Sequence, residues 1–160
     1  MDVYVGFDSA WTDNPKAPHA ICAVGIEGGQ AVWFRRPECA SFDQALAIIK
    51  ADCAERGATL IAIDQPTVVP NLTGTRPVDR VAASLISWLG GGVQPANRGK
   101  RGMFSLPRKK DQDMLDAAIC ELVALRWRLR PRGESMLIGN LETGYMVLPA
   151  SAQVRERLVA

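Results

Sequence analysis

Histidine and paired cysteines are nearly absent from this sequence. His19 is the only histidine, and the four cysteines show no Cys-x-x-Cys spacing. Because a structural zinc site needs about four such ligands, we expect no Cys/His metal site. A chain of this size also needs no disulfides, so the cysteines should be reduced. Any metal or acid–base chemistry would therefore depend on carboxylates.

Long apolar runs are also missing. No uninterrupted stretch approaches the ~20 residues that cross a bilayer, and the N-terminus lacks the basic-then-apolar pattern of a secretory signal. We therefore expect a soluble, cytoplasmic protein that does not bind membranes. With 48% apolar and 22% charged residues, the composition is that of a globular protein and excludes a disordered or collagen-like chain. The 160 residues suit one domain spanning 1–160.

Charge is nearly balanced overall but unevenly distributed. The net charge is +2, whereas the region 98–132 is strongly basic. A glycine-rich stretch at the start of this region is the better candidate for binding phosphate groups. Its basic residues are Arg98, Lys100, Arg101, Arg108, Lys109 and Lys110. The later arginines alternate by two, which scatters them around a helix and favours a solvated helix end.

The first part of the chain has the pattern of a small mixed sheet. Alternating β-formers predict three antiparallel strands, at 3–8, 20–26 and 31–34. The continuous apolar run at 59–63 predicts a strand that is central, buried on both faces and parallel to the first. Between these strands, Ser41 begins a capping-box signature for an amphipathic helix. The residues expected on its buried face are Phe42, Ala45, Leu46, Ile49 and Cys53.

Two further helices are predicted in the second half. Pro77 suits the first position of a helix that continues to about Leu89, and the longest helical pattern runs from about 110 to 130. The apolar stripe of this longest helix, which should face the core, consists of Leu115, Ala118, Ile119, Leu122, Leu125 and Leu129.

Loops and a hairpin complete the predicted elements. Residues 90–109 have the pattern of a glycine-rich loop, with a short strand as one interpretation of 103–106. Segments 135–138 and 145–148 should form a closing hairpin, and Ser151 can cap a terminal helix.

Aspartates stand at the ends of two predicted strands. Asp8 and Asp64 follow the first strand and the parallel strand, where ligands bind in open α/β sheets. Asp113 and Asp116 are neighbours on one side of the longest helix. Clustered carboxylates stay ionised only when positive charge lies among them, and oxygen ligands suit Mg²⁺ or Mn²⁺. Two such ions about 3.5–4 Å apart can promote phosphodiester hydrolysis.

Structural interpretations of the same residues remain open. Each aspartate taken alone is common at turns and helix starts, and Asp113 could complement the helix dipole. Arg76 and Asp79 fit an ion pair between a loop and a helix as well as a substrate contact.

Four segments together carry a family resemblance. They are 5–11 (VGFDSAW), 61–66 (IAIDQP), 76–80 (RPVDR) and 113–118 (DMLDAA). The chain thereby resembles the DUF429 family, a group of predicted nucleases with a ribonuclease-H-like fold. The resemblance implies an α/β, three-layer architecture in which a three-stranded antiparallel meander plus a parallel strand is flanked by helices.

The same resemblance implies a function and a set of site residues. The implied function is that of a divalent-metal-dependent nuclease that uses Mg²⁺ or Mn²⁺ and binds nucleic acid. The residues that match metal-binding acids of ribonuclease H and Holliday-junction resolvases are the catalytic Asp8, Asp64 and Asp116, with Asp113 as a further metal ligand. The resemblance also favours Arg76 and Asp79 as substrate contacts.

One departure from the family pattern affects these expectations. Family members usually carry an additional strand and helix between the Arg76–Asp79 motif and the last aspartate-bearing helix. Here the basic stretch alone fills that interval, so a fifth strand is short, missing or replaced by the hairpin at 135–148. The open sheet edge that results would be covered in a homodimer.

Two other functions fit the same pattern. A ribonuclease-H-like scaffold without catalytic activity could bind nucleic acid or a protein partner, which the short middle region makes plausible. A phosphotransferase of the actin or sugar-kinase type shares the early strand order, but such enzymes close two domains over a nucleotide.

Overall fold

The computed structural model describes residues 1–9, 17, 19–87, 92–93, 96, 98 and 109–159. These residues form a mixed α/β structure that divides into two compact units. The first unit comprises Met1–Gln65 and Gly102–Arg128, and the second comprises Pro66–Arg101 and Leu129–Ala160. Among the described residues, no helix combines the length and the hydropathy that crossing a membrane requires.

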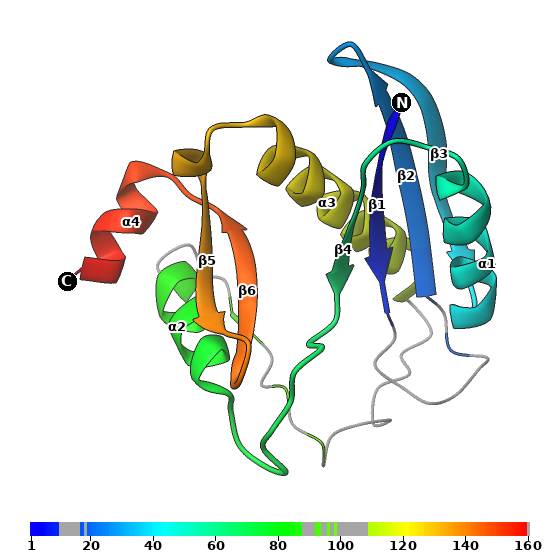
Figure 1. Ribbon diagram of the computed structural model, residues 1–160. Coiled ribbons are helices and arrows are strands. Elements are labelled where there is room, and N and C mark those ends of the chain that lie inside the picture. Colours follow the sequence, from blue (N-terminus) through cyan, green and yellow to red (C-terminus); the bar gives the residue numbers. More distant parts are fainter. Residues whose placement is uncertain are drawn as a thin grey trace. The chain divides into compact units, whose positions relative to one another are not determined.

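A four-stranded mixed sheet forms the first unit. The strands are β1 (Asp2–Asp8), β2 (His19–Glu27), β3 (Gln30–Ala40) and β4 (Thr59–Asp64), in the spatial order β3-β2-β1-β4 (Figure 1). β1, β2 and β3 pair antiparallel, and β4 pairs parallel with β1. The predicted meander with one parallel strand is therefore confirmed. β3 is longer than the predicted strand because its ladder with β2 continues past Phe34 to Ala40.

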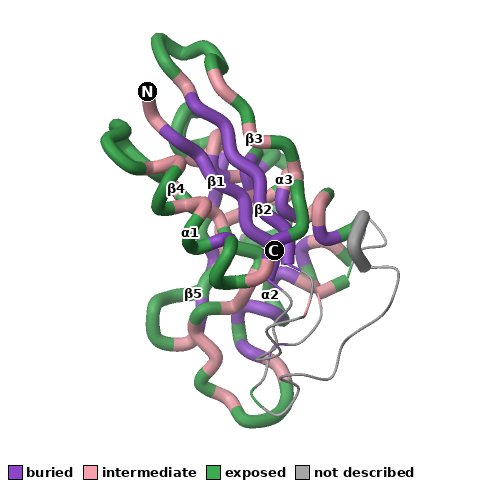
Figure 2. Tube along the Cα trace, turned by 90° about the vertical axis from the view of Figure 1, so that its right-hand side faces the viewer, coloured by how far each residue is buried: buried purple, intermediate pink, exposed green. Residues whose placement is uncertain are grey.

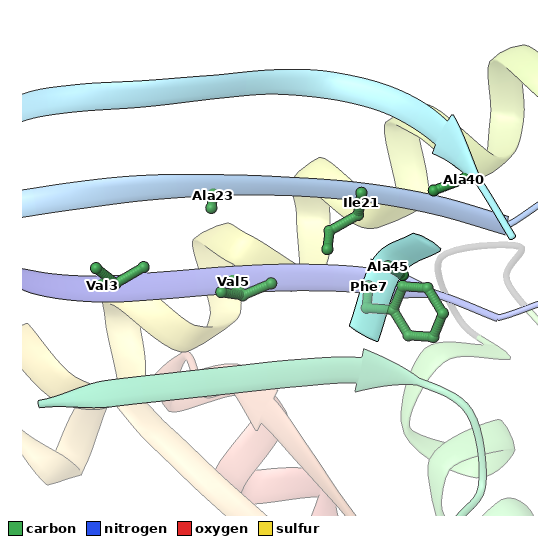
Figure 3. Packing of buried hydrophobic residues seen from close by; sticks show 7 residues of the cluster. All are labelled: Val3, Val5, Phe7, Ile21, Ala23, Ala40 and Ala45. Atoms are coloured by element: carbon green, nitrogen blue, oxygen red, sulfur yellow. The ribbon is translucent and has the colours of Figure 1, made fainter. Parts of the chain in front are cut away.

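One face of this sheet packs against α1 (Phe42–Cys53). Alternation along β1 directs Val3, Val5 and Phe7 to this face, where residues of β2 and α1 join them in a core (Figure 3). The predicted capping box is present, since the Ser41 hydroxyl accepts from the Gln44 N–H. The predicted buried face is only partly correct. Ala45 is buried and Ile49 and Cys53 pack on the core, whereas Phe42 and Leu46 are exposed.

The opposite face packs against α3 (Lys109–Leu129). Small residues allow a close approach here: Ala20 and Cys22 of β2 form a core cluster with Ala117 of α3. Gly6 of β1 is required at its position, because a Cβ there would overlap the Ala117 carbonyl oxygen. Figure 2 shows β1 and β2 as the most continuously buried strands.

The predicted core-facing stripe of α3 is only partly correct. Ala118 and Leu125 pack against core clusters, but the other four residues of the stripe do not. Leu115, Ile119, Leu122 and Leu129 are exposed. The buried positions lie on the other side of the helix and are Asp113, Ala117, Glu121 and Ala124. The reason is steric: around Ala117 the sheet offers glycine, alanine and cysteine, and these small residues let the helix backbone come close.

The predicted central position of β4 is also wrong within the described residues. β4 is parallel to β1, as predicted, but it is the last strand of the sheet. Ile61 and Ile63 are exposed, at 38% and 44%, so the strand is not buried on both faces. A continuous apolar run indicates a strand but does not tell how many neighbours cover it.

The second unit packs a helix on a hairpin. α2 (Pro77–Ile86) buries Val78, Ala82 and Leu85 against β5 (Ser135–Asn140) and β6 (Gly144–Pro149). A short 3₁₀ helix, η3 (Arg132–Glu134), precedes β5, and α4 (Ala152–Val159) follows β6.

Several predictions for the second unit can be assessed. The predicted hairpin is confirmed, and the Ser151 hydroxyl caps α4 by accepting from the Val154 N–H. β5 and β6 pair with each other in a two-stranded sheet of their own. Leu89 and the short strand predicted at 103–106 lie outside the described residues.

Candidate functional site: a carboxylate cluster at the end of the first sheet

Asp8 and Asp64 lie side by side at the carboxyl ends of β1 and β4. They are register partners in the parallel ladder, and neighbouring strands run about 4.8 Å apart. Asp8 shares the side-chain parity of Gly6, and Asp64 shares that of Ala62, so both carboxylates belong to the face that α3 covers. Asp8 is buried and Asp64 is exposed. The first pair of the predicted site is thus assembled.

The charge of Asp116 acts on the Cys120 thiol, as the charges of Asp8 and Asp64 do. Asp116 and Cys120 lie on α3, four positions apart and therefore on one side of the helix. Burial, together with the negative charges of Asp64, Asp8 and Asp116, raises the pKa of the Cys120 thiol to about 12. A hydrogen bond from the Asp64 backbone acts in the opposite direction. Three of the predicted carboxylates are therefore close enough for their charges to act on one thiol.

Asp113 lies one turn earlier on α3 and is fully buried, at 0% exposure. It precedes Ala117 by four residues, on the stripe that faces the sheet. Asp113 is the fifth residue of α3, so it also lies near the helix start, as the dipole interpretation expects. The structure thus places Asp113 on the buried side of α3.

Glu121 and Cys22 form a buried pair that the sequence analysis did not identify. The Cys22 thiol and the Glu121 carboxyl share a hydrogen bond beneath the cluster. Burial raises the pKa of Glu121, which the bond to Cys22 partly opposes, and burial also raises the pKa of Cys22. Glu121 Oε2 makes no hydrogen bond within the described part of the chain. In the sequence, Asp113, Ala117 and Glu121 follow one another at intervals of four, which places them on one side of a helix. This spacing is the pattern that could have identified Glu121 as a residue of the buried side.

The fit of this cluster to a metal ion is chemical rather than geometric. Carboxylate oxygens are the ligands that Mg²⁺ and Mn²⁺ prefer. In the described ranges, however, no group of three or more histidine, cysteine or acidic side chains is arranged to hold an ion. The residues present therefore match a hard divalent cation in kind and in location, without forming a coordination shell.

Arg76 and Asp79 form a buried ion pair in the second unit. The guanidinium donates from Nε and Nη2 to the Asp79 carboxylate, at 3.1 and 2.6 Å, and from Nη1 to the Val68 carbonyl oxygen. The Asp79 carboxylate also accepts from the Ala96 N–H. Both side chains are at most 2% exposed, so the predicted loop-to-helix pair exists, and it is an interior pair rather than a surface one. Their proposed contact with substrate stays a prediction.

The predicted phosphate-binding stretch is described only at its ends. Arg98 donates from Nη2 to the Pro70 carbonyl oxygen at 2.7 Å, and its backbone N–H donates to Asn71. The remaining candidates lie outside the described residues or have side chains outside them; these are Lys100, Arg101, Arg108, Lys109 and Lys110. Phosphate binding by this stretch therefore also stays a prediction.

A shallow surface hollow on β3 is occupied by internal ion pairs. It is lined by Trp33, Phe34, Arg35, Arg36 and Glu38. Arg35 makes a bidentate bond to Asp52 of α1, a bond to Glu38 and a contact over the Trp33 ring. Arg35, one of the two arginines that line this hollow, is thus already paired with carboxylates, and the carboxylate cluster is the better candidate site.

The comparisons with known proteins add no relative. No family model, no curated protein and no solved structure matches this chain. The resemblance to the DUF429 family therefore stays a prediction from the sequence segments that carry it.

Proposed function

We propose that this protein is a divalent-metal-dependent nuclease with a ribonuclease-H-like fold, as its resemblance to the DUF429 family implies. The observation that supports this most directly is the pairing of Asp8 with Asp64 at the ends of adjacent parallel strands, with the charge of Asp116 acting in the same neighbourhood. Carboxylates gathered at the end of a sheet are a recurrent feature of sites for hard cations.

In this proposal the carboxylates bind Mg²⁺ or Mn²⁺. Asp8, Asp64 and Asp116 are the ligands, and Asp113 supports them from the interior side of α3. The ion, when bound, supplies Lewis-acid stabilisation of the charge that develops on phosphate oxygens. The chain itself fixes the carboxylates on one face, because Gly6 lets α3 approach β1 closely. The basic residues at 98–110 are the proposed contacts to the nucleic-acid backbone.

A thermal melt with and without metal tests this proposal. Millimolar Mg²⁺ or Mn²⁺ at fixed ionic strength should raise the midpoint of the wild type, since an ion at about 100 times its Kd stabilises the folded state by about 2.7 kcal/mol. Asp64→Asn should abolish this response, because it removes a charged ligand and little volume. Asp64 is suitable because it is exposed. Asp43→Asn, an exposed first-turn position of α1, is the matched control and should respond like the wild type.

A nuclease assay on structured and single-stranded nucleic acids follows the melt. Cleavage that needs metal and is lost in Asp64→Asn, but not in Asp43→Asn, would establish the activity. If neither wild type nor Asp64→Asn responds to metal, and Asp64→Asn melts higher, then the carboxylates only repel one another. That result would exclude the metal site and favour the non-catalytic scaffold.

A further inference from the structure

Every nitrogen of the Arg76 guanidinium and both oxygens of the Asp79 carboxylate are engaged in hydrogen bonds inside the second unit. Nε and Nη2 of Arg76 donate to Asp79, and Nη1 donates to the Val68 carbonyl oxygen at 2.9 Å. Asp79 Oδ2 also accepts from the Ala96 N–H at 3.0 Å. Both side chains are at most 2% exposed. Groups that are buried and bonded in this way are better suited to holding the chain in place than to contacting a ligand.

The ion pair connects three segments of the second unit to the start of α2. Val68 belongs to the chain that follows β4, and Ala96 lies just before the basic stretch. The hairpin is the third segment, because a Cβ added at Gly144 would lie 2.9 Å from Arg76 Nη1. Removing one partner of a buried ion pair leaves an uncompensated charge, so this connection resists breaking.

Further hydrogen bonds extend from Ala96 to Arg98. Asn71 Nδ2 donates to the Ala96 carbonyl oxygen at 3.2 Å, and the Arg98 N–H donates to the Asn71 carbonyl oxygen at 3.2 Å. Arg98 Nη2 donates to the Pro70 carbonyl oxygen at 2.7 Å. Residues 70 and 71 therefore hold both the backbone and the guanidinium of Arg98. The bond to Pro70 uses one of the five N–H donors of this guanidinium.

We propose that Arg76 and Asp79 are positioning residues, which fix Ala96 and thereby orient Arg98 for contact with a phosphate group. This inference rests on the proposed function, which supplies the nucleic-acid ligand. It differs from the direct substrate contact that the family resemblance implies for Arg76 and Asp79. A guanidinium that is already oriented loses less side-chain entropy when it binds a phosphate, so the ion pair would favour binding without touching the ligand.

Amide hydrogen exchange tests whether the ion pair fixes this segment. The N–H groups of Ala96 and Arg98 are both hydrogen-bonded, so we expect them to exchange slowly in the wild type. Asp79→Asn removes the charge that binds Arg76 and weakens the acceptor of the Ala96 N–H. Exchange at Ala96 and Arg98 should then accelerate at least roughly tenfold, and clearly more than in the β5 amides that pair with β6.

Asn71→Ala is a second variant that leaves the ion pair intact. It removes the Nδ2 bonds to the Ala96 and Thr73 carbonyl oxygens but leaves no buried charge unpaired, so it decides the question if Asp79→Asn does not fold. Exchange at Ala96 and Arg98 should again accelerate, with little change in β5. The matched control is Ser84→Ala, which removes a side-chain bond to the Val81 carbonyl oxygen on α2 and should leave exchange at both positions unchanged.

Binding of a fluorescent single-stranded oligonucleotide, without divalent metal, tests the step from Arg98 to phosphate. Arg98→Gln should weaken binding and lower the slope of log K against log salt by about 0.7, because one phosphate contact is lost. Asn71→Ala and Asp79→Asn should also weaken binding. Combined with Arg98→Gln, neither should weaken it further, because both act through Arg98. In the matched background Arg130→Gln, which removes an exposed arginine of the same unit, Asn71→Ala should keep its full effect.

Three results would overturn the proposal. Equal acceleration of exchange at Ala96, Arg98 and β5 would mean that the ion pair only supports the stability of the unit. Additive effects of Asn71→Ala and Arg98→Gln on binding would mean that Asn71 does not act through Arg98. A wild type that binds no oligonucleotide would exclude the phosphate contact, whereas the metal-dependent melt decides separately whether the carboxylates form a metal site.

Discussion

Glu121 is a carboxyl group in an interior position whose nearest polar partner is a thiol. Its pKa lies above the ordinary value of 4.5 because burial disfavours the charged form. A raised carboxyl pKa contributes stability that is complete below pH 4.5 and is lost as the pH rises through the folded-state pKa. Ionised Glu121 is therefore a source of instability at neutral pH and above.

We predict that Glu121→Gln increases the stability of the protein at pH 8 by about 1–3 kcal/mol and leaves it nearly unchanged at pH 4. Glutamine reproduces the shape of the neutral acid and removes the charge. Urea denaturation of both chains at several pH values measures the effect. The control is Glu142→Gln, an exposed position in the turn between β5 and β6, which should change the stability little at either pH. A loss of stability at pH 8 would contradict the prediction, because it would show that the carboxylate is needed in its charged form.

Residues of the candidate site differ in how far the sequence reveals them. Asp8 and Asp64 could be predicted because a strand end is a local pattern, and the register of two strands then places them together. Glu121 and the burial of Asp113 could not, since they depend on which side of α3 meets the sheet. Charged residues are mostly exposed in proteins, so a charged residue in a helix is expected to be solvated unless the elements packed against it are known.

At the scale of elements, Gly6 determines how closely α3 lies against β1. A Cβ at Gly6 would overlap the Ala117 carbonyl oxygen and crowd the backbone nitrogen of Glu121. Neither group is the flexible end of a side chain, so the helix backbone would have to move. Because Asp116 and Cys120 lie on that helix, the position of α3 determines where Asp116 lies relative to Asp8 and Asp64.

We predict that Gly6→Ala destabilises the protein by about 1–3 kcal/mol and also removes any metal-induced rise in its melting midpoint. The displaced helix would carry Asp116 away from Asp8 and Asp64. Denaturant unfolding and thermal melts with Mg²⁺ or Mn²⁺ measure the two effects. Gly133→Ala, where the added Cβ meets only open space, is the control and should change neither. If Gly6→Ala is destabilised but its melting midpoint still rises fully with metal, then metal binding does not require the close packing of α3 on β1.

The positions of the helices and strands could be predicted better than which side of each one is buried. The positions of α1, α2 and α3, and of the six strands that the described residues form, follow from periodicity, caps and glycines that act locally. The buried face of α3 could not be predicted, because its leucines form the more apolar side, whereas the small residues beneath it, Gly6, Ala20 and Cys22, admit only a close, small-residue contact. Hydrophobicity identifies a face that avoids water, and sterics decide which neighbour can cover it.

At the scale of the whole chain, each of the two units has hydrophobic clusters of its own among the described residues. The clusters around Val5, Tyr4 and Ala117 all lie in the first unit. The cluster of Val78, Leu85 and their neighbours on the hairpin lies in the second. Each of these described clusters resists local opening of the unit to which it belongs.

We predict that damage to one core acts mainly on its own unit. Leu85→Ala removes a side chain that is only 2% exposed and should destabilise the second unit by about 2–5 kcal/mol. Native-state hydrogen exchange should then accelerate in α2, β5 and β6 and change little in β1 and β2. Val5→Ala, in the core of the first unit, should produce the reverse pattern. Equal acceleration in both units from either variant would mean that the chain opens as one cooperative body, in which case a substitution remote from the carboxylates would weaken the candidate site as much as one beside it.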